Sequence, residues 1–258
     1  MRKSALTYKT IPRKDFYIDT NYQILHEDGD LIVVDKPAPL AVHPVGAYAE
    51  LNLQTLLQRD PRWAGVPIKT VHRLDAETSG VLIIAKTSDA ASALGRQFMN
   101  GSIQKTYEAI VFGCPAESRG DITDPLGYDQ SSGFQTVRVR DPETGEPAHT
   151  RYEVTASGPD YARVRLVPFT GRTHQLRAHL AMLGHPIVGD KIYVDLNLFA
   201  RYVSGGLDDD MVRRLKLPRL ALHASELTLT HPRTRAVCRF ASSLPPLLSD
   251  FASTHGLA

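Results

Sequence analysis

This sequence of 258 residues predicts an α+β fold, in which many short strands alternate with only a few helices. The first observation is that short runs of β-branched and aromatic residues recur along the chain, as at 31–34, 81–85 and 161–167. The second is that helical spacing of apolar residues is confined to a few segments, with turn-forming Gly, Pro and Asp between the strands. The third is a hydrophobic content of 42%, which is sufficient for a buried core.

The first ninety residues predict a strand pair, a proline-rich loop and two helices. Residues 22–25 and 31–34 are expected to be strands joined by a turn that contains Gly29. Three prolines within 37–44 exclude a helix or a central strand from the segment that follows. The expected N-caps are Asn52 for a helix with Leu53, Leu56 and Leu57 on its apolar face, and Ser88 for a helix with Ala91, Leu94 and Phe98.

Two polar features stand out in the centre of the sequence, one in a loop before a strand and one on a strand. Residues 71–80 form a polar loop directly before a buried strand, and the strand therefore fixes one end of the loop. Arg73 and Asp75 lie two residues apart in this loop, a spacing that by itself predicts a surface ion pair. Residues 105–111 are the next expected strand, in which Tyr107 points to the buried side, where such a residue is most often a packed aromatic side chain.

The C-terminal half predicts mainly strands and turns. Residues 117–150 are rich in Gly, Pro, Asp and Ser and predict loops with short strands. Arg163 and Arg165 share one face of a hairpin strand, which is either a solvated face or a phosphate contact. The remaining expected elements are a hairpin of 150–154 with 161–167, surface turns and a short basic helix within 194–219, and closing strands at 221–224 and around 231–233.

A helix is predicted within residues 171–186, with Thr173 near its N-cap. Arg177 lies on a face next to the core and can be partly buried there. His174 and His179 are five residues apart and lie on different helix faces, which argues against a metal site. The expected core stripe of this helix is Leu176, Leu180 and Leu183.

Composition limits the classes of function. The net charge of +2 places any affinity for nucleic acid in local clusters rather than in the overall charge. Cys114 and Cys238 are far apart and predict free thiols in a reducing cytosol. No apolar run approaches the roughly 18 residues of a membrane helix, and residues 1–20 are expected to be a basic arm rather than a secretory signal. We therefore expect a cytoplasmic protein without a membrane anchor.

The stretch 72–80 reads HRLDxxTSG and resembles the signature of the RluA-type RNA pseudouridine synthases. Three other stretches resemble motifs of that family: 35–44, where Pro39 replaces the usual Gly of DKPxGxxVHP, the K-x-Y spacing that ends at Tyr107, and the GRxHQLRxHxxxxGHPIxGD pattern at 171–190. The resemblance implies a mixed, mostly antiparallel sheet with flanking helices and a central RNA-binding cleft. It places a catalytic domain at 21–246 and a tail at 247–258, without the S4-like domain that many relatives carry.

The resemblance also implies a role for individual residues. Asp75 would be the catalytic carboxylate, Arg177 would pair with it, and Tyr107 would pack against the target base, with Leu176 as further support of the active site. The expected RNA-binding and base-flipping residues are Arg73, His72, Arg172 and His174. The implied partner is ribosomal or transfer RNA, bound by a monomer that uses no cofactor and no metal.

Two other classes use some of the same residues. A nucleoside or glycoside hydrolase commonly needs two carboxylates, and Glu77 lies near Asp75 in the sequence. Release of free uracil would distinguish it from an isomerase. A non-catalytic RNA-binding module is the other alternative, but binding alone does not need a buried acid that repels phosphate.

Overall fold

A computed structural model describes residues 17–134 and 136–258. Most of the basic arm that the sequence predicts at 1–20 lies outside the described residues. Residues 17–22 contain no helix or strand, and regular structure begins with β1 (Gln23–Glu27). Among the described residues, no helix combines the length and apolar character needed to cross a membrane.

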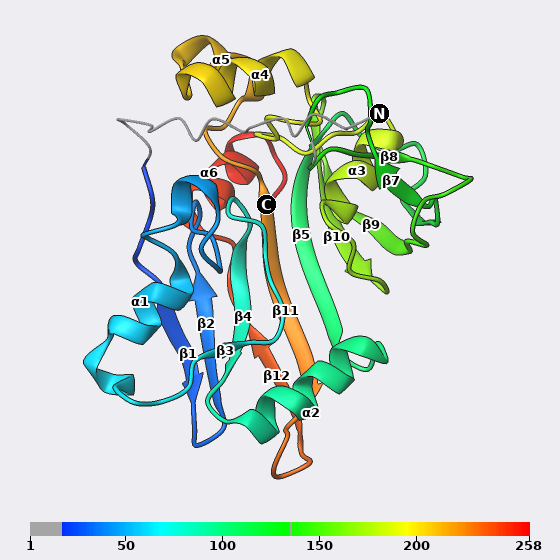
Figure 1. Cartoon of the computed structure of the whole chain (residues 1–258). Helices are drawn as coiled ribbons and strands as arrows, with labels where there is room; N and C mark the ends of the chain where they lie inside the picture. Colours follow the sequence, from blue (N-terminus) through cyan, green and yellow to red (C-terminus); the bar gives the residue numbers. More distant parts are fainter. Residues whose placement is uncertain (1–16, 135) are drawn as a thin grey trace, which may run out of the picture.

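The centre of the molecule is a curved sheet of ten strands (Figure 1). Every pairing in this sheet is antiparallel except that of β4 with β11, which confirms the predicted mixed, mostly antiparallel α+β class. The main strand order is β1, β2 (Leu31–Lys36), β4 (Ser79–Ala85), β11 (Leu222–Thr230), β5 (Gln104–Phe112), β10 (Tyr161–Pro168), β9 (Thr150–Ser157) and β6 (Arg119–Ile122). The strands β12 (Val237–Ala241) and β3 (Lys69–Thr70) pair with β11 and β4, and β7 (Leu126–Tyr128) and β8 (Arg138–Arg140) form a separate pair.

The helices flank this sheet and begin at caps that their sequences supply. Asn52 accepts a hydrogen bond from the amide of Thr55, as predicted for the start of α1. The cap of α2 is Thr87 rather than Ser88, because the hydroxyl of Thr87 accepts from the amide of Ala90. The helices are α1 (Leu53–Arg59), α2 (Ser88–Met99), α3 (Gln175–Met182), α4 (Leu196–Gly205), α5 (Asp209–Leu215) and α6 (Pro246–Thr254), with short 3-10 turns at Gly46–Tyr48 and Pro61–Trp63.

Three sequence-based expectations differ from the structure. The segment expected to form surface turns contains a second helix, α4, which lies beside α5 in Figure 1. Leu198 of α4 packs in one cluster with Met211 and Leu215 of α5. Residues 247–258 were expected to be a tail, whereas most of them form α6, which buries Leu248 and Ala252, and Leu257 after the helix is buried in the same cluster. Leu183, expected in the core stripe of α3, is 38% exposed because the helix ends at Met182 and the chain turns there.

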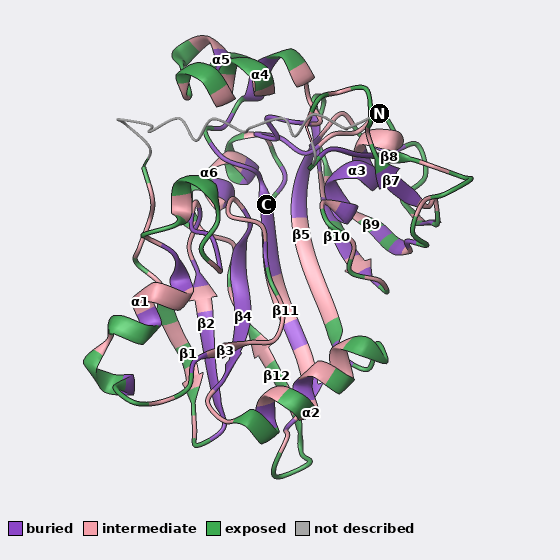
Figure 2. Cartoon of the chain, in the orientation of Figure 1, coloured by how far each residue is buried: buried purple, intermediate pink, exposed green. Residues whose placement is uncertain are grey.

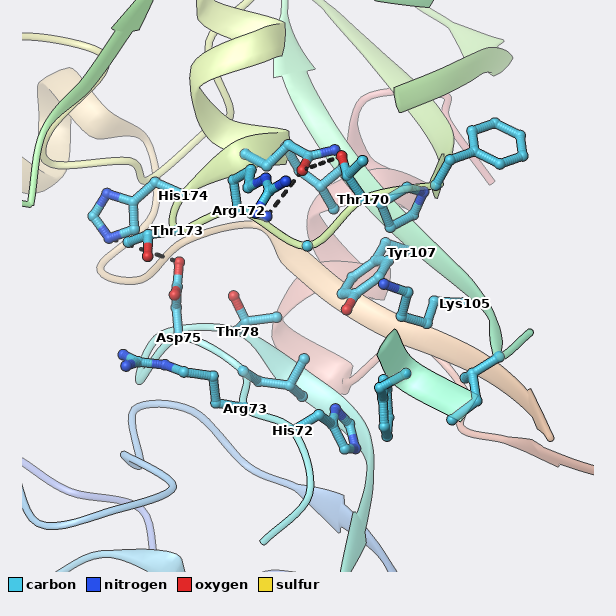
Figure 3. A pocket seen from close by; sticks show the side chains of 18 of the residues that line it. His72, Arg73, Asp75, Thr78, Lys105, Tyr107, Thr170, Arg172, Thr173 and His174 are labelled. Atoms are coloured by element: carbon cyan, nitrogen blue, oxygen red, sulfur yellow. Dashed lines mark hydrogen bonds and ion pairs between the residues drawn. The ribbon is translucent and has the colours of Figure 1, made fainter. Parts of the chain in front are cut away.

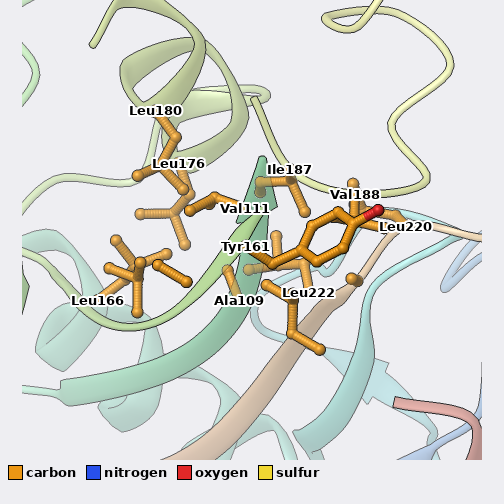
Figure 4. Close-up of a cluster of buried hydrophobic side chains, with 14 of the residues drawn as sticks. Ala109, Val111, Tyr161, Leu166, Leu176, Leu180, Ile187, Val188, Leu220 and Leu222 are labelled. Carbon is orange, nitrogen blue, oxygen red and sulfur yellow. The ribbon is translucent and has the colours of Figure 1, made fainter. Parts of the chain in front are cut away.

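Two hydrophobic clusters meet along the centre of the sheet. Burial is greatest on β4, where all seven residues are buried (Figure 2). The larger cluster joins β5, β10 and β11 to α3 and α6, and Figure 4 shows Leu176 and Leu180 of α3 packed over Val111 and Leu166. The second cluster lies under α1 between β2 and β4. Tyr107 packs against both clusters and therefore lies at the line where they join.

The parallel contact between β4 and β11 is unusually close. Gly80 has a φ of +111°, and a Cβ atom there would lie 2.2 Å from the carbonyl oxygen of Ala224. Next to it, the hydroxyl of Ser79 lies 2.9 Å from His223 Nδ1 and accepts a hydrogen bond from Arg219. Only glycine permits this approach, which fixes the start of β4 and hence the loop before it.

The two arginines that share a face of β10 pair with acids on neighbouring strands. Arg163 binds Glu108 of β5, and Arg165 lies 3.5 Å from Glu153 of β9. This favours the interpretation of a solvated, ion-paired face over that of a phosphate contact.

Candidate active site

The loop that contains Asp75 is held by the core on one side and by backbone hydrogen bonds on the other. Leu74 is 5% exposed and packs in the cluster under α1. The amide of Thr78 donates to the carbonyl of Asp75 at 3.0 Å, which closes a turn. The carbonyl of Ala76 accepts from the amide of Leu40 at 2.8 Å, which ties the loop to the proline-rich segment.

A fully buried lysine stabilises this loop through hydrogen bonds to backbone carbonyl groups. Lys36 donates from Nζ to the carbonyl oxygens of Pro37, Leu40 and Ala76, at 2.9, 2.7 and 3.3 Å. Burial lowers its pKa to about 7, since a charged ammonium is poorly solvated in the core. The lysine therefore joins the proline-rich segment to the Asp75 loop.

Asp75 and Arg177 meet, although 101 residues separate them in the sequence. One Nη atom of Arg177 donates to Asp75 Oδ2 at 3.2 Å. The other side of the guanidinium makes two bonds to the buried Asp190, from Nε at 2.7 Å and from the second Nη at 2.9 Å. Asp190 in turn accepts hydrogen bonds from the backbone amides of Ile192 and Tyr193. This chain of contacts aims a rigid cation at the carboxylate of Asp75.

These charges keep Asp75 ionised despite its partial burial. Burial favours a higher pKa for Asp75, but His174 and Arg177 outweigh it and hold the pKa below its ordinary value. Burial also lowers the pKa of His174 to about 4, so that His174 is neutral at pH 7. Arg177 is therefore the group that stabilises the carboxylate at neutral pH. Burial opposes the charge of Arg177 as well, but Asp190 and Asp75 raise its pKa above the ordinary value.

Asp75 lies where two cavities join. One cavity has a volume of about 530 Å³ and the other of about 950 Å³. The first extends over Tyr107 and Lys105 of β5, which lie across from Asp75 and Arg73 in Figure 3. The second extends between the 41–49 loop and α4. Both are lined by Arg73, Leu74, Asp75, His174 and Arg177.

Tyr107 provides a flat, uncharged wall in the smaller cavity. Burial, and then the charge of Asp75, raises the pKa of its phenol, which stays protonated at neutral pH. Lys105 lines the same cavity and has no acidic partner among the described residues. The cavity therefore combines an aromatic surface, an unpaired cation and an ionised carboxylate.

The structure brings together most of the residues that the sequence singled out, but their surroundings differ from one residue to the next. His72 lines the smaller cavity, yet its Nε2 accepts the amide of Ile83 at 3.0 Å and its ring stacks on Phe98. Burial lowers its pKa to about 3, so it is a neutral support of the loop. Arg172 lies at the rim and binds Glu146 at 2.8 Å and the carbonyl of Pro147.

Of the three other predicted residues, Arg73 and His174 lie at the junction and Leu176 lines the smaller cavity. Arg73 is exposed and makes no side-chain hydrogen bond or ion pair among the described residues. His174 has a left-handed backbone with a φ of 55°, and its Nε2 lies 3.9 Å from Asp75 Oδ2. Leu176 is 7% exposed and belongs both to the lining of the smaller cavity and to the large core cluster.

The sequence analysis did not single out Asp190, Lys36 or Lys105 as site residues. Each lies inside a motif that the sequence displays, so a signal was present. What was missing is the three-dimensional contact that gives each residue its partner.

The second carboxylate that a hydrolase would need is bound elsewhere. Glu77 accepts two hydrogen bonds from Lys191, at 2.7 and 2.8 Å, and one from the amide of Leu220. Both of its oxygens are thus engaged in a contact between the loop and the segment after α3. This position disfavours Glu77 as a partner of Asp75 across a scissile bond.

One cluster of described residues has the composition of a metal site, at the tip of the β1–β2 hairpin: Asp28, Asp30 and His231. The amides of Arg233 and Thr234 donate to His231 Nδ1 at 3.2 and 3.1 Å. Its Nε2 therefore carries the proton and donates it to Asp28 at 3.0 Å. Asp30 is bound by Arg233, and the described contacts of the three side chains already form a hydrogen-bond network.

The site combines one carboxylate, one guanidinium and one aromatic wall, and the comparison with known proteins identifies the class of protein that carries it. A family model described as RNA pseudouridylate synthase matches residues 30–182, which is more than half of the chain. The chain belongs to the RNA pseudouridylate synthase family, the isomerases that convert uridine in RNA to pseudouridine. The RluA-type resemblance seen in the sequence is confirmed by this match together with the relatives described next.

Individual relatives agree with this assignment. The chain is 41% identical over 213 residues to the dual-specificity RNA pseudouridine synthase RluA of Escherichia coli K12, covering 81% of this chain and 87% of the relative. It is 37% identical over 225 residues to the ribosomal large subunit pseudouridine synthase D of Nitrosomonas europaea, covering 86% of this chain but 62% of that relative. Among solved structures, human RNA pseudouridylate synthase domain containing 4 is 31% identical with a TM-score of 0.67, covering 89% of this chain and 91% of that one. Human RNA pseudouridylate synthase domain containing 1 is 25% identical with a TM-score of 0.68, and the match covers 92% of this chain and 96% of that one.

Proposed function

We propose that this protein isomerises specific uridines of ribosomal RNA to pseudouridine, with Asp75 as the reacting carboxylate. The observation that carries the proposal is the contact of Asp75 with Arg177 at 3.2 Å, at the junction of two cavities and across from Tyr107. A partly dry carboxylate held ionised by a buried cation is costly to build, and such pairs are concentrated at working sites.

The reaction needs few groups, and the cleft supplies a candidate for each. The bond between ribose C1′ and uracil N1 breaks, the uracil turns, and C1′ joins uracil C5, whose proton moves to N1. Asp75 acts on the nucleotide as nucleophile or base. Arg177 keeps Asp75 charged and aimed, and the protonated Tyr107 offers its ring to the uracil. Substrate and product are isomers, so no cofactor has to supply energy.

A base in a folded RNA has to leave its stack before it can enter this cleft. Arg73 is exposed beside Asp75 and makes no ion pair among the described residues, which leaves its side chain available for RNA. In the proposal it occupies the place that the flipped nucleotide leaves. Arg172 contacts the RNA at the rim of the cavity, and His174 contacts it at the junction. His72 holds the neighbouring Arg73 in place, because its ring accepts a hydrogen bond from the backbone amide of Ile83 in β4.

The choice of ribosomal RNA is supported by the relative from Nitrosomonas europaea, whose name refers to the large ribosomal subunit. Transfer RNA is the second possible target. We further expect a cytoplasmic monomer that needs neither metal nor cofactor. Gel filtration and activity after treatment with a chelator test the last two points.

The decisive experiment compares Asp75→Asn with Asp209→Asn, a matched change at an exposed carboxylate on α5. Ribosomal RNA transcripts are incubated with each protein, digested to nucleosides and analysed chromatographically for pseudouridine and free uracil. We expect Asp75→Asn to form no pseudouridine while its RNA affinity stays within a few-fold of wild type, and Asp209→Asn to be fully active. Pseudouridine formation by Asp75→Asn would contradict the assigned role, and release of free uracil by the wild type would indicate a hydrolase.

A further inference from the structure

A half-exposed phenylalanine lies on the rim of the smaller cavity and has no part in the chemistry above. Phe169 is 48% exposed, in the segment between β10 and α3. It lines the same cavity as Tyr107 and Lys105. Exposing an aromatic ring of this size is unfavourable in water, and an exposed apolar side chain beside a functional cleft is a candidate contact for a ligand.

The ring of Phe169 is fixed in position by its neighbours. Its amide donates to the carbonyl of His149 at 2.9 Å, and the side chain of Gln175 donates to the same carbonyl. The imidazole of His149 stacks on Phe169, with 4.3 Å between ring centres and 24° between the planes. Asp121 holds His149 at 2.6 Å. The ring is thus held by stacking on His149, yet the residue stays 48% exposed and keeps area available for a ligand.

One cation lies beside this ring, and a second lines the same cavity. The guanidinium of Arg151 lies 5.2 Å from the centre of the Phe169 ring and is held by Asp121. Lys105 lies in the cavity without an acidic partner among the described residues. Proteins that bind single-stranded nucleic acids combine aromatic rings, on which bases stack, with cations that contact the backbone, and this cavity offers both.

We propose that Phe169 is the stacking platform for an unpaired base next to the target uridine in the same RNA strand. This inference rests on the proposed function, since it assumes that the uridine occupies the cavity over Tyr107. Two aromatic rings then serve one cavity: Tyr107 receives the reacting base, and Phe169 receives its neighbour. Lys105 lies in the cavity they share and neutralises a phosphate of the strand. The protein thus selects a uridine whose neighbour is free to leave its own stack.

The test uses a short single-stranded RNA with one uridine between two adenosines, and the same RNA with abasic residues in place of both adenosines. Fluorescence anisotropy measures the affinity of each RNA for the wild type, Phe169→Leu and Phe169→Trp. The matched control is Tyr128→Leu, because Tyr128 is 52% exposed, has Arg138 over its ring and lies outside the lining of both cavities. Unfolding curves establish that all variants are folded.

We expect the wild type to bind the intact RNA about tenfold more tightly than the abasic RNA, within the range seen when one base–aromatic stack is removed. Phe169→Leu loses this preference, whereas Phe169→Trp and Tyr128→Leu keep it. A wild type without the preference, or a Phe169→Leu variant that retains it, overturns the proposal.

A separate measurement tests the proposed function: pseudouridine formation on ribosomal RNA by the wild type. If the wild type forms pseudouridine and Phe169→Leu retains the preference, the platform is wrong and the function stands. If the preference depends on Phe169 but no pseudouridine forms, the binding site stands and the reaction is wrong.

Discussion

Replacement of Gly80 by alanine tests whether the close contact between β4 and β11 positions the active site. The added Cβ would lie 2.2 Å from the carbonyl oxygen of Ala224, whereas real Cβ atoms keep at least 3.0 Å and mostly more than 3.4 Å. The two strands must therefore separate by 0.8 to 1.2 Å, which is 3.0 − 2.2 and 3.4 − 2.2. The φ of +111° adds backbone strain that glycine alone avoids.

The expected magnitude follows from these two costs. Backbone strain at such a residue costs about 1–3 kcal/mol and overpacking in a core about 1–3 kcal/mol. We expect the free energy of unfolding to fall by roughly 2–5 kcal/mol, a large part of the stability of an ordinary domain. The shift also moves the Asp75 loop away from Tyr107 on β5. A displacement of this size is expected to lower the rate of pseudouridine formation about 100-fold.

The assay combines urea unfolding with pseudouridine formation on ribosomal RNA, at a temperature at which each variant is folded. The control is Gly95→Ala in α2, where a Cβ would have no atom within 4 Å. This change is expected to stabilise the protein by about 0.5–1 kcal/mol, since alanine is the better helix former, and to leave the rate unchanged. Wild-type stability and rate in Gly80→Ala would refute the reasoning, and lost stability with an unchanged rate would refute its link to the site.

The other predictions concern buried charges. Arg177→Lys cannot bind Asp190 through two nitrogens and reach Asp75 as well, and the rate is expected to fall at least 100-fold. Arg177 lowers the pKa of Asp75, so its replacement should raise that pKa. As the pH is lowered, the variant should therefore lose activity at a higher pH than the wild type does. An acid side of the pH–rate profile that is unchanged in the variant would contradict this. The pKa of Lys36 is about 7 in the folded protein, against an ordinary value of 10.5. Between these two pH values the unfolded state binds more protons than the folded state, so the free energy of unfolding rises with pH, by roughly 5 kcal/mol over the whole interval. Lys36→Met should lack this rise when urea unfolding is compared at pH 7 and 9, and parallel changes in both proteins would exclude a neutral buried lysine.

Local patterns were sufficient for much of the fold. The β1–β2 hairpin, the Asn52 cap of α1, and strands β5, β9 and β10 each follow from residues within one short stretch. Helix α4 was not predicted from the sequence. Its apolar face packs mainly against α5, outside the main core. Helix α3 shows a related limit: Gln175 and His179 are buried along with its leucines, so no single apolar stripe describes its environment.

The sequence by itself displayed the family motifs, and with them the prediction that Asp75, Tyr107 and Arg177 are site residues. Only the tertiary structure decided the partners: Asp190 for the guanidinium, Lys191 for Glu77, and a backbone amide for His72. The reason is physical. Hydrophobic periodicity and caps depend on neighbours within a few residues, whereas a pKa or an ion pair depends on atoms within a few ångströms, which the chain brings together from distant segments only when it folds.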